Sequence, residues 1–442
     1  MRSSSSSRVL TTVLVLFFAL VCWFTSSGHS LPLPLDGLRP VSATTIAGRL
    51  AVFDDVWETV EERYYDPTFR GLDWEGRRTP FREAAGKAQD SEQLYEVLRQ
   101  MLAPLKDAHT RVYSPDNKFD WWTPKFITVG LTIREVAGKP TVTNVDSKSE
   151  AARSGIKPGD VLLTVNSTRV DDLLETRLKD YGSKINDSLR YRAIAAILDG
   201  PVDTAVELRW QTSSNQIKSA RLQRYWTQRE LGFSSFRKNG IAVIKLDTFT
   251  QPIALDFARS LPEMVGDARS LILDLRTNGG GDAEAMNDIA SLFLPDGISL
   301  GVFADRSGAS FELSTLLRRT QIALSTKQLD ISMVVLTSEA TSSAAEIMAA
   351  TFQTKGRAVV IGSNTCGCVL AIRSRHSLPD GGILDVSEFD FRTPAGQRLE
   401  GTGVKPNVLV ANSRRDIYDH RDAALDTART LLRKRQVSTT TR

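Results

Sequence analysis

The chain has 442 residues, enough for two or three domains of ordinary size and for a substantial buried core. Its 56 lysine and arginine residues slightly exceed its 52 aspartate and glutamate residues, and the surplus is spread along the chain rather than gathered in one stripe. This charge distribution does not support nucleic-acid binding, so no nucleic-acid partner is expected.

The first 30 residues have the layout of a secretory signal. Arg2 and Arg8 flank a serine run, an apolar stretch covers residues 9–24, and a small polar segment covers residues 25–30. The apolar stretch is short for a membrane span of about 20 residues, although an uncleaved signal anchor stays open as an alternative. We expect export to a periplasmic or other extracytoplasmic compartment, with transient membrane contact through this segment only.

Helices are expected after the signal. Apolar residues recur at helical spacing over residues 46–64, and Asp66-Pro67 ends that pattern. A second helix is expected at residues 81–88. Ser91 is expected to cap a third helix, and the helical domain is complete near Leu105.

Short β-type runs replace this pattern between residues 126 and 222, with an amphipathic helical stretch at 171–198 among them. From Gly240 onward, apolar strands alternate with helices, which is typical of an α/β core. A polar helix and a disordered threonine-rich tail are expected at the end. The expected division is a signal at 1–30, a linker at 31–44, a helical domain at 45–118, a β-rich module at 126–222, an α/β core at 223–425 and a polar tail at 426–442.

The β-rich module contains turns in a fixed order. A small helix is followed by a turn at Gly155 and by the Pro158-Gly159-Asp160 turn before a buried strand. This run resembles a PDZ domain, which implies a loop of backbone N–H groups that receives a free peptide carboxylate while the ligand adds a strand to the sheet edge. That loop is expected at Val129, Gly130, Leu131 and Thr132. The alternative is that these glycines only form hairpin turns.

A glycine-rich turn follows one of the core strands. The strand SLILDLRT runs into Asn278-Gly279-Gly280-Gly281, and a helix is expected directly afterwards. Free backbone N–H groups at such a turn can hold an anion or an oxyanion. A phosphate loop would need a Lys-Ser or Lys-Thr pair as well, and the turn lacks one.

The next strand–turn–helix segment, VVLTSEATSSAAEIMAA, places Ser343 at a helix start. It is similar to the serine-bearing segment of the carboxyl-terminal processing peptidases, as is the order of helical domain, PDZ domain and α/β core. The resemblance implies a multidomain α/β protein with a crotonase-like peptidase core, which cleaves polypeptides near a free C-terminus without metal or other cofactor. It also implies Ser343 as nucleophile and an oxyanion hole at Ala344 and Gly280, with Gly281 as the alternative. Taken alone, a serine here would be interpreted as a helix cap.

The Ser-Lys pair of the familiar members is missing from this chain. The position of their lysine is Cys368, that of the supporting glutamine is Ile372, and that of an acidic residue found in many members is Thr354. Ser343 still requires a base, because a free serine hydroxyl is a weak nucleophile at neutral pH.

His109 is the candidate base. It lies in LKDAHTRVY, which resembles the Leu-x-Asp-x-His-Thr run of the family. In the tricorn-like branch the base is a histidine assisted by an acidic residue late in the core, and Glu400 is the best match to that residue. An ordinary histidine pKa predicts a rate that rises through roughly pH 6 to 7. The alternative for His109 is a structural hydrogen bond between helical domain and core.

Only two cysteines follow the signal, Cys366 and Cys368. Their Cys-Gly-Cys spacing strains a disulfide, and no cation adjoins Cys368, so we expect Cys368 to be a small apolar filler rather than a bridge partner or a nucleophile. The alternative function is a catalytically inactive PDZ adaptor that binds protein C-termini, which the loss of the lysine favours. A lipid or acyl hydrolase is a third alternative, but the chain lacks its GxSxG turn.

Overall fold

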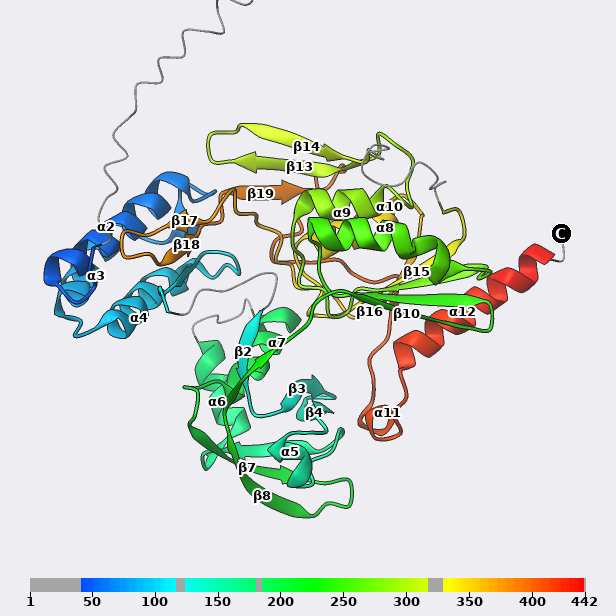
Figure 1. Cartoon of the computed structure of the whole chain (residues 1–442), viewed down its shortest axis with the longest axis horizontal. Coiled ribbons are helices and arrows are strands. Elements are labelled where there is room, and N and C mark those ends of the chain that lie inside the picture. Colours follow the sequence, from blue (N-terminus) through cyan, green and yellow to red (C-terminus); the bar gives the residue numbers. More distant parts are fainter. Residues whose placement is uncertain (1–40, 117–123, 180–184, 317–328, 441–442) are drawn as a thin grey trace, which may run out of the picture. The chain divides into compact units, whose positions relative to one another are not determined.

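The computed structural model describes residues 41–116, 124–179, 185–316 and 329–440 (Figure 1). The predicted signal, and all of the predicted linker except its last four residues, lie outside the described residues. From residue 43 onward the chain forms one compact unit. None of the helices in the described ranges is both long and apolar enough to cross a bilayer.

Three helices open the described chain, as the apolar spacing predicts. They are α2 (Ile46–Arg63), α3 (Glu75–Lys87) and α4 (Ser91–Leu102). α3 begins earlier than predicted, because the Asp73 carboxylate accepts a hydrogen bond from the Gly76 N–H and starts the helix there. The predicted cap of α4 is wrong: Asp90, not Ser91, is the N-cap, and its carboxylate accepts from the Gln93 N–H at 2.8 Å.

A small antiparallel sheet fastens the helical domain to the α/β core. β1 (Arg111–Tyr113) pairs with β18 (Ile383–Asp385), which also pairs with β17 (His376–Ser377). His376 adds a side-chain link, with its Nε2 2.8 Å from Asp55 Oδ2 on α2. Because His109 precedes β1 by two residues, this sheet also fixes the turn that carries His109.

The β-rich module is a six-stranded sheet with β3 at one edge. Its main strands, in the order β3, β4, β5, β7 and β8, are Leu131–Val136, Lys139–Val145, Val161–Val165, Ala205–Gln211 and Ile217–Gln223, and β6 (Thr168–Arg169) pairs with β5. The predicted helical stretch 171–198 corresponds to α6 (Val170–Leu178), α7 (Asp187–Ala195) and a final 3-10 turn. α7 packs against the edge strand β3.

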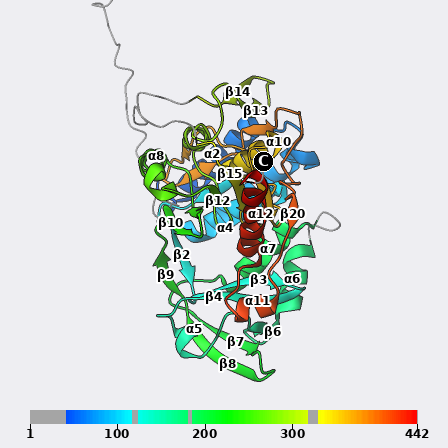
Figure 2. The same ribbon diagram turned by 90° about the vertical axis from the view of Figure 1, so that its right-hand side faces the viewer.

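The core is built on a second six-stranded sheet, in which β10 is antiparallel and the other strands are parallel. In the order β10, β11, β12, β15, β16 and β20, the strands are Phe233–Lys238, Ile241–Leu246, Ser270–Asp274, Ser332–Thr337, Val359–Gly362 and Val408–Leu409. α8 (Gln251–Val265), α9 (Ala283–Ala290) and α10 (Ala344–Thr354) cover one face, and α12 (Ala423–Thr440) covers the other (Figures 1 and 2).

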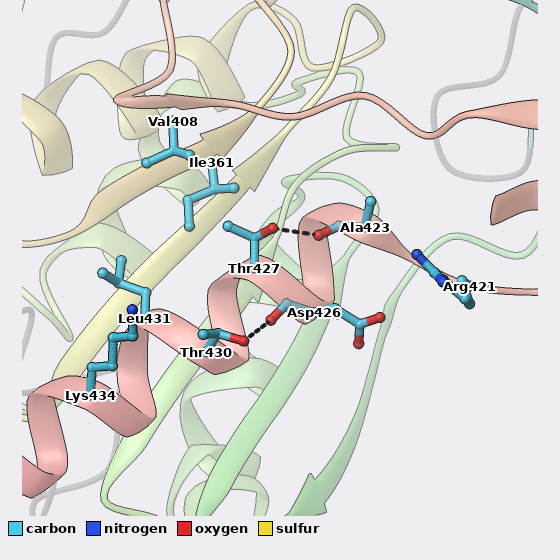
Figure 3. Close-up of a pocket in the computed structure, with 9 residues that line it drawn as sticks. All are labelled: Ile361, Val408, Arg421, Ala423, Asp426, Thr427, Thr430, Leu431 and Lys434. Atoms are coloured by element: carbon cyan, nitrogen blue, oxygen red, sulfur yellow. Dashed lines mark hydrogen bonds between the residues drawn. The ribbon is translucent and has the colours of Figure 1, made fainter.

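The C-terminal segment contains the predicted polar helix. This helix, α12, begins at Ala423 and extends to Thr440, so it includes most of residues 426–442, which were predicted as a polar tail. Ala424, Ala428 and Leu432 lie four residues apart and are buried against the sheet, so a narrow apolar stripe among polar residues is enough to fix the helix. Figure 3 shows α12 beside Ile361 and Val408 of the sheet.

The carboxyl ends of the parallel strands carry the turns that the sequence analysis singled out. The glycine turn follows β12, the Ser343 turn follows β15, and the segment with the two cysteines follows β16. These three strands are neighbours in the sheet, so their carboxyl ends meet at one edge. Open α/β sheets bind their ligands at this edge.

Candidate active site

Ser343 lies in a strained turn between β15 and α10. It is the N-cap of α10, with φ 56° and ψ −127°, whereas a capping serine normally has an extended backbone with negative φ. Holding a residue other than glycine in such a conformation costs about 1–3 kcal/mol, and residues of this kind cluster at functional turns. A strained strand-to-helix turn is also how other hydrolases expose a nucleophilic serine.

The glycine turn packs directly on the Ser343 turn. The Ser342 hydroxyl donates to the Gly279 carbonyl at 2.9 Å, which ties the two turns together. A Cβ on Gly280 would stand 2.6 Å from Ser343 Cβ and 3.2 Å from the Ala344 nitrogen, and Gly280 has a φ of 96°. Only glycine therefore allows this close approach.

The predicted oxyanion donors differ in their availability. The Gly280 N–H donates to Asn278 Oδ1 at 2.8 Å and is therefore engaged within its own turn. In the described part of the chain, the N–H groups of Gly281 and Ala344 have no acceptor. The Ala344 N–H is also at the N-terminus of α10, where unpaired donors and the helix dipole favour negative charge. The backbone N–H groups of Ala344 and Gly281 are therefore available to donate hydrogen bonds to an oxyanion.

Residues 365–370, which we call the cysteine loop, connect the two sides of the site. The Cys368 carbonyl accepts the Ser343 N–H at 2.9 Å. One residue later, the Val369 N–H donates to Glu400 Oε2 at 2.9 Å. The loop therefore spans from the predicted nucleophile to the predicted acidic residue.

Glu346 lies fully buried beneath the Ser343 turn and receives four hydrogen bonds. The donors are the Ser343 N–H, the Thr365 hydroxyl, the Gly367 N–H and the Cys368 N–H, at 3.1, 2.5, 2.7 and 2.9 Å. Within the described residues no lysine or arginine pairs with it, and burial raises the pKa of Glu346 to about 7 in spite of these donors. Glu346 was not predicted as a site residue, although a glutamate three positions after a serine at a helix start is the capping-box signal.

Glu400 is hydrogen-bonded to the cysteine loop, and the negative charge of Asp107 raises its pKa. Its carboxylate accepts from the Val369 and Leu370 N–H groups, at 2.9 and 3.3 Å. Burial raises the pKa of Glu400; the Val369 N–H opposes this rise and the negative charge of Asp107 adds to it. Glu400 therefore lies within electrostatic reach of the turn that carries His109.

Asp107 organises the His109 turn. Its Oδ1 accepts from the His109 N–H at 2.8 Å and from the Thr110 N–H at 2.7 Å, which is an Asx turn. The same oxygen accepts from the Ser387 hydroxyl of the core at 2.9 Å, and the Ser387 N–H donates to the Thr110 hydroxyl at 3.1 Å. The alternative expected for His109, a link between helical domain and core, is thus provided by its neighbours instead.

Burial favours the neutral form of the His109 side chain. Its Nδ1 is buried without a hydrogen-bond partner, and burial lowers the pKa of His109 to about 4, with Asp107 opposing and Arg111 and Arg192 contributing. With His109 as the base, this lowered pKa moves the predicted rise in rate from pH 6 to 7 down to about pH 4. Among the described residues, no hydrogen bond joins His109 to Ser343 or to Glu400.

Cys366 and Cys368 form a disulfide, so the expectation that Cys368 is an unpaired apolar filler is wrong. Gly367 between them has a φ of 66°, which folds the chain back and brings the two Cα atoms to 5.2 Å. The Cys-Gly-Cys spacing alone does not show that the central glycine can adopt this positive φ.

Three family models match successive parts of the chain. The model of peptidase family S41 matches residues 240–410, the tricorn protease C1 domain matches residues 47–103, and a PDZ domain matches residues 128–192. Carboxyl-terminal-processing peptidase 3, chloroplastic, of Arabidopsis thaliana is 27% identical over 88% of this chain and 74% of its own length. The carboxyl-terminal-processing protease of a Picosynechococcus strain is 27% identical over 80% of this chain and 81% of its own.

The chain is a serine-type peptidase that is similar to the carboxyl-terminal-processing peptidases in sequence and in domain order. The predicted resemblance, the serine-type hydrolase class and the multidomain α/β fold class are thereby confirmed. Solved structures agree in fold. The photosystem II D1 C-terminal processing protease is 24% identical over 82% of this chain and 93% of its own, with a TM-score of 0.52. Mature CPAF in complex with lactacystin is 14% identical over 84% and 95%, with a TM-score of 0.63.

In the PDZ domain of this peptidase, the predicted carboxylate loop comprises the two residues between β2 (Lys125–Thr128) and β3, Val129 and Gly130, and the first two residues of β3. Gly130 there has a φ of 84°, and its N–H donates to the Thr128 hydroxyl at 3.0 Å. Toward the other end of β3, Glu135 forms an ion pair with Arg190 of α7, with nitrogen and oxygen 2.7 Å apart. An ion pair therefore bridges the two elements between which a peptide strand would be added.

A large cleft of the peptidase lies at the carboxyl edge of its core sheet. Its volume is about 850 Å³, and its lining includes β3 and β4 of the PDZ domain, the residues that follow β12, β15 and β16, and Arg276. Two carboxylates hold the Arg276 guanidinium, with nitrogen–oxygen distances of 2.6 Å to Asp274 and 2.8 Å to Asp422. The cleft thus extends from the edge strand of the PDZ domain to the strand ends that carry the Ser343 turn.

A second hollow, of about 500 Å³, lies between α12 and the sheet (Figure 3). Its Thr427 and Thr430 hydroxyls donate to the carbonyls of Ala423 and Asp426 within the helix. Its lining has no histidine or cysteine. In the ranges that the structure describes, no cluster of three or more histidine, cysteine, aspartate or glutamate side chains could hold a metal ion.

Proposed function

We propose that this peptidase is an exported serine endopeptidase that captures the tail of a polypeptide in its PDZ domain and cuts near the free C-terminus through Ser343. The observation that carries the proposal is the backbone of Ser343, whose positive φ is maintained beside two free N–H groups at Gly281 and Ala344. Strain of this kind persists only where the surrounding structure imposes it.

The proposed chemistry is acyl transfer. His109 takes the proton from the Ser343 hydroxyl while the oxygen attacks the scissile carbonyl carbon, and the N–H groups of Ala344 and Gly281 stabilise the oxyanion. The protonated His109 then donates its proton to the leaving amine. Water, deprotonated by the same histidine, hydrolyses the acyl-enzyme and releases Ser343. The neutral state of His109 suits the first step.

Formation of the complete site requires a movement of His109 toward Ser343. Hydrogen bonds between catalytic groups are often long or absent without substrate and tighten only in the complex. Asp107 is positioned to guide this movement, because its Oδ1 holds the His109 backbone and its Oδ2 is buried without a partner. We assign Glu400 the role of completing the acidic side of the site, through its bonds to the cysteine loop.

The test is labelling by a fluorophosphonate, which reacts with activated serines. We expect labelling of the wild-type protein at Ser343, confirmed by peptide mass spectrometry, and none in Ser343→Ala, which should still fold and bind peptides. Ser342→Ala is the matched control, because Ser342 only bonds the Gly279 carbonyl, and it should keep its labelling with a smaller loss of activity. Equal behaviour of the two variants would reject Ser343 as the nucleophile.

The second candidate function is a PDZ adaptor without peptidase activity. One observation favours it: the lysine position is occupied by a disulfide cysteine, and among the described residues no hydrogen bond joins the replacement base to Ser343. An adaptor would bind peptides with a free carboxylate, yet neither react with the fluorophosphonate nor release product.

A further inference from the structure

The Cys366–Cys368 disulfide lies at the centre of the candidate site. Cys366 is 8% exposed and Cys368 is 4% exposed. The Cys366 N–H donates to the Thr341 carbonyl at 2.9 Å, and the Cys368 carbonyl accepts the Ser343 N–H at 2.9 Å. Each cysteine is therefore bonded through its backbone to the turn that holds the proposed nucleophile.

The residue between the cysteines is equally constrained. The Gly367 N–H donates to Glu346 at 2.7 Å, and its carbonyl accepts the Gly401 N–H at 2.8 Å. A Cβ on Gly367 would stand 2.8 Å from the Thr402 nitrogen, so the loop has no room to shift toward that side. A disulfide across this glycine fixes the loop in the one shape that satisfies these bonds on both sides.

The PDZ domain also contacts the disulfide. The Ser188 hydroxyl of α7 donates to Cys366 Sγ at 3.1 Å. Two further bonds accompany it: Asn364 Nδ2 donates to Asp187 Oδ2 at 3.2 Å, and Asn186 Nδ2 donates to the Gly401 carbonyl at 3.3 Å. The start of α7 thus lies on the cysteine loop and shields the disulfide from solvent.

We propose that the Cys366–Cys368 disulfide is a redox-dependent activation site, closed and active in an oxidising compartment and open and inactive in a reducing one. The inference rests on the proposed function of Ser343. When the disulfide opens, a dithiol reductant is oxidised to its own disulfide. The two electrons and two protons that the reductant gives up convert the bond between Cys366 and Cys368 into two thiols. Once this bond is open, no covalent link holds the two cysteines together, and the Cys368 carbonyl leaves the Ser343 N–H.

Such a site would keep the peptidase silent before export. Disulfides persist in exported proteins and are reduced in the cytosol. The sequence has no cysteine after the signal other than this pair, so any effect of a reductant on the exported chain must act through it.

The experiment compares the oxidised and reduced forms of the exported protein. One sample is purified from an oxidising compartment; the other is refolded in dithiothreitol, because burial protects the disulfide of the folded protein. Thiol alkylation with mass spectrometry measures the oxidised fraction, and a fluorogenic peptide with a free carboxylate measures activity. We expect at least about a tenfold lower kcat in the reduced form, since small displacements of catalytic groups have effects of this size. Reoxidation should restore kcat in proportion to the oxidised fraction.

The double variant Cys366→Ser/Cys368→Ser is the control. It should have the low kcat of the reduced form and be insensitive to dithiothreitol. Ser188→Ala, which loses the hydrogen bond to Cys366, should keep its activity when oxidised and be reduced faster. Equal kcat for the oxidised and reduced forms, or full alkylation of both cysteines in the protein from the oxidising compartment, would overturn the inference.

These outcomes separate the inference from the proposed function. An inactive oxidised protein that also fails to react with the fluorophosphonate would remove Ser343 as the nucleophile, and the redox site with it. An active oxidised protein whose reduced form is equally active would remove the redox site alone.

Discussion

The Ser343 turn is built from one continuous strand, turn and helix, whereas the surroundings of His109 are assembled from separate stretches of the chain. The first contains its own stabilising carboxylate, Glu346, three residues after the serine. The second depends on Asp107, on Ser387 of the core and on Glu400 beyond it. The nucleophile turn is therefore formed by adjacent residues within the core, whereas the base side forms only when helical domain and core are joined.

The largest expected effect tests the surroundings of His109, which are assembled from separate stretches of the chain. His109→Ala should lower kcat by about a thousandfold to ten thousandfold, as loss of the base does in serine peptidases. Folding should be little affected, because His109 Nδ1 makes no hydrogen bond in the described structure. Stopped assays with a fluorogenic peptide measure the rate, and thermal unfolding checks the fold.

His376→Ala is the matched histidine control. His376 is bonded to Asp55 on the helical domain, so its loss should lower the unfolding temperature and leave kcat close to that of the wild type. If the two variants lose activity equally, His109 is a structural residue and the base side must be sought elsewhere.

The next largest effect tests the Ser343 turn, which is formed by adjacent residues. Glu346→Gln replaces one carboxylate oxygen, which accepts two of the four hydrogen bonds, by an NH2 group, so at least one buried N–H donor loses its acceptor, at a cost of about 1–3 kcal/mol. The Ser343 turn should loosen, and kcat should fall by about a hundredfold with little change in the affinity for peptides. Glu263→Gln, at an exposed position of α8, is the control and should behave as the wild type. An unchanged kcat in Glu346→Gln would show that the turn holds Ser343 without this carboxylate.

The pH dependence of stability separates the same two regions. Burial raises the pKa of Glu346 from 4.5 to about 7, so the folded state holds this proton more tightly and stability increases as the pH falls through that range. Burial lowers the pKa of His109 from 6.5 to about 4, so the unfolded state holds that proton more tightly and stability decreases as the pH falls. Between about pH 4.5 and 6.5 the two contributions oppose each other.

We therefore expect that removing either titrating group exposes the contribution of the other group to the pH dependence of stability. Urea unfolding of Glu346→Gln should show a steeper loss of stability from pH 6.5 to 4.5 than the wild type, and His109→Ala should show a relative gain over the same range. Glu263→Gln should follow the wild-type curve. Parallel curves for all four proteins would mean that neither buried group changes its protonation on unfolding.

The same contrast between local and long-range contacts explains which parts of the fold and of the site could be predicted from the sequence. Ser343 and the glycine turn follow from a strand, small residues and a helix start, all adjacent in the chain. The apolar spacing likewise gave α2 and the alternating core. Ser387 and Ser188 carry no local signal, because their roles arise from contacts between segments far apart in the sequence. The disulfide was missed because the spacing alone hides the positive φ of Gly367.

The smallest expected effect concerns peptide capture. The ion pair between Arg190 and Glu135 bridges α7 and β3, and Arg134 lies over the Tyr191 ring, with 4.5 Å from its guanidinium carbon to the ring centre. A peptide that adds a strand to β3 must separate the ion pair. Because Arg190 and Glu135 are partly exposed, the pair stabilises the closed arrangement by only about 0.2–1 kcal/mol.

Glu135→Gln and Arg190→Gln should therefore each bind a peptide with a free carboxylate about 1.4-fold to fivefold more tightly than the wild type, which is the affinity equivalent of that energy. Calorimetry measures the affinities, with an amidated peptide as the control for carboxylate recognition. Asp171→Asn, which breaks the exposed ion pair of Arg169 in the same domain, should leave the affinity unchanged. If only Glu135→Gln binds more tightly, the freed Arg190 attracts the ligand carboxylate. If neither variant differs from Asp171→Asn, the peptide does not enter between α7 and β3, and its binding site must lie on another edge of the domain.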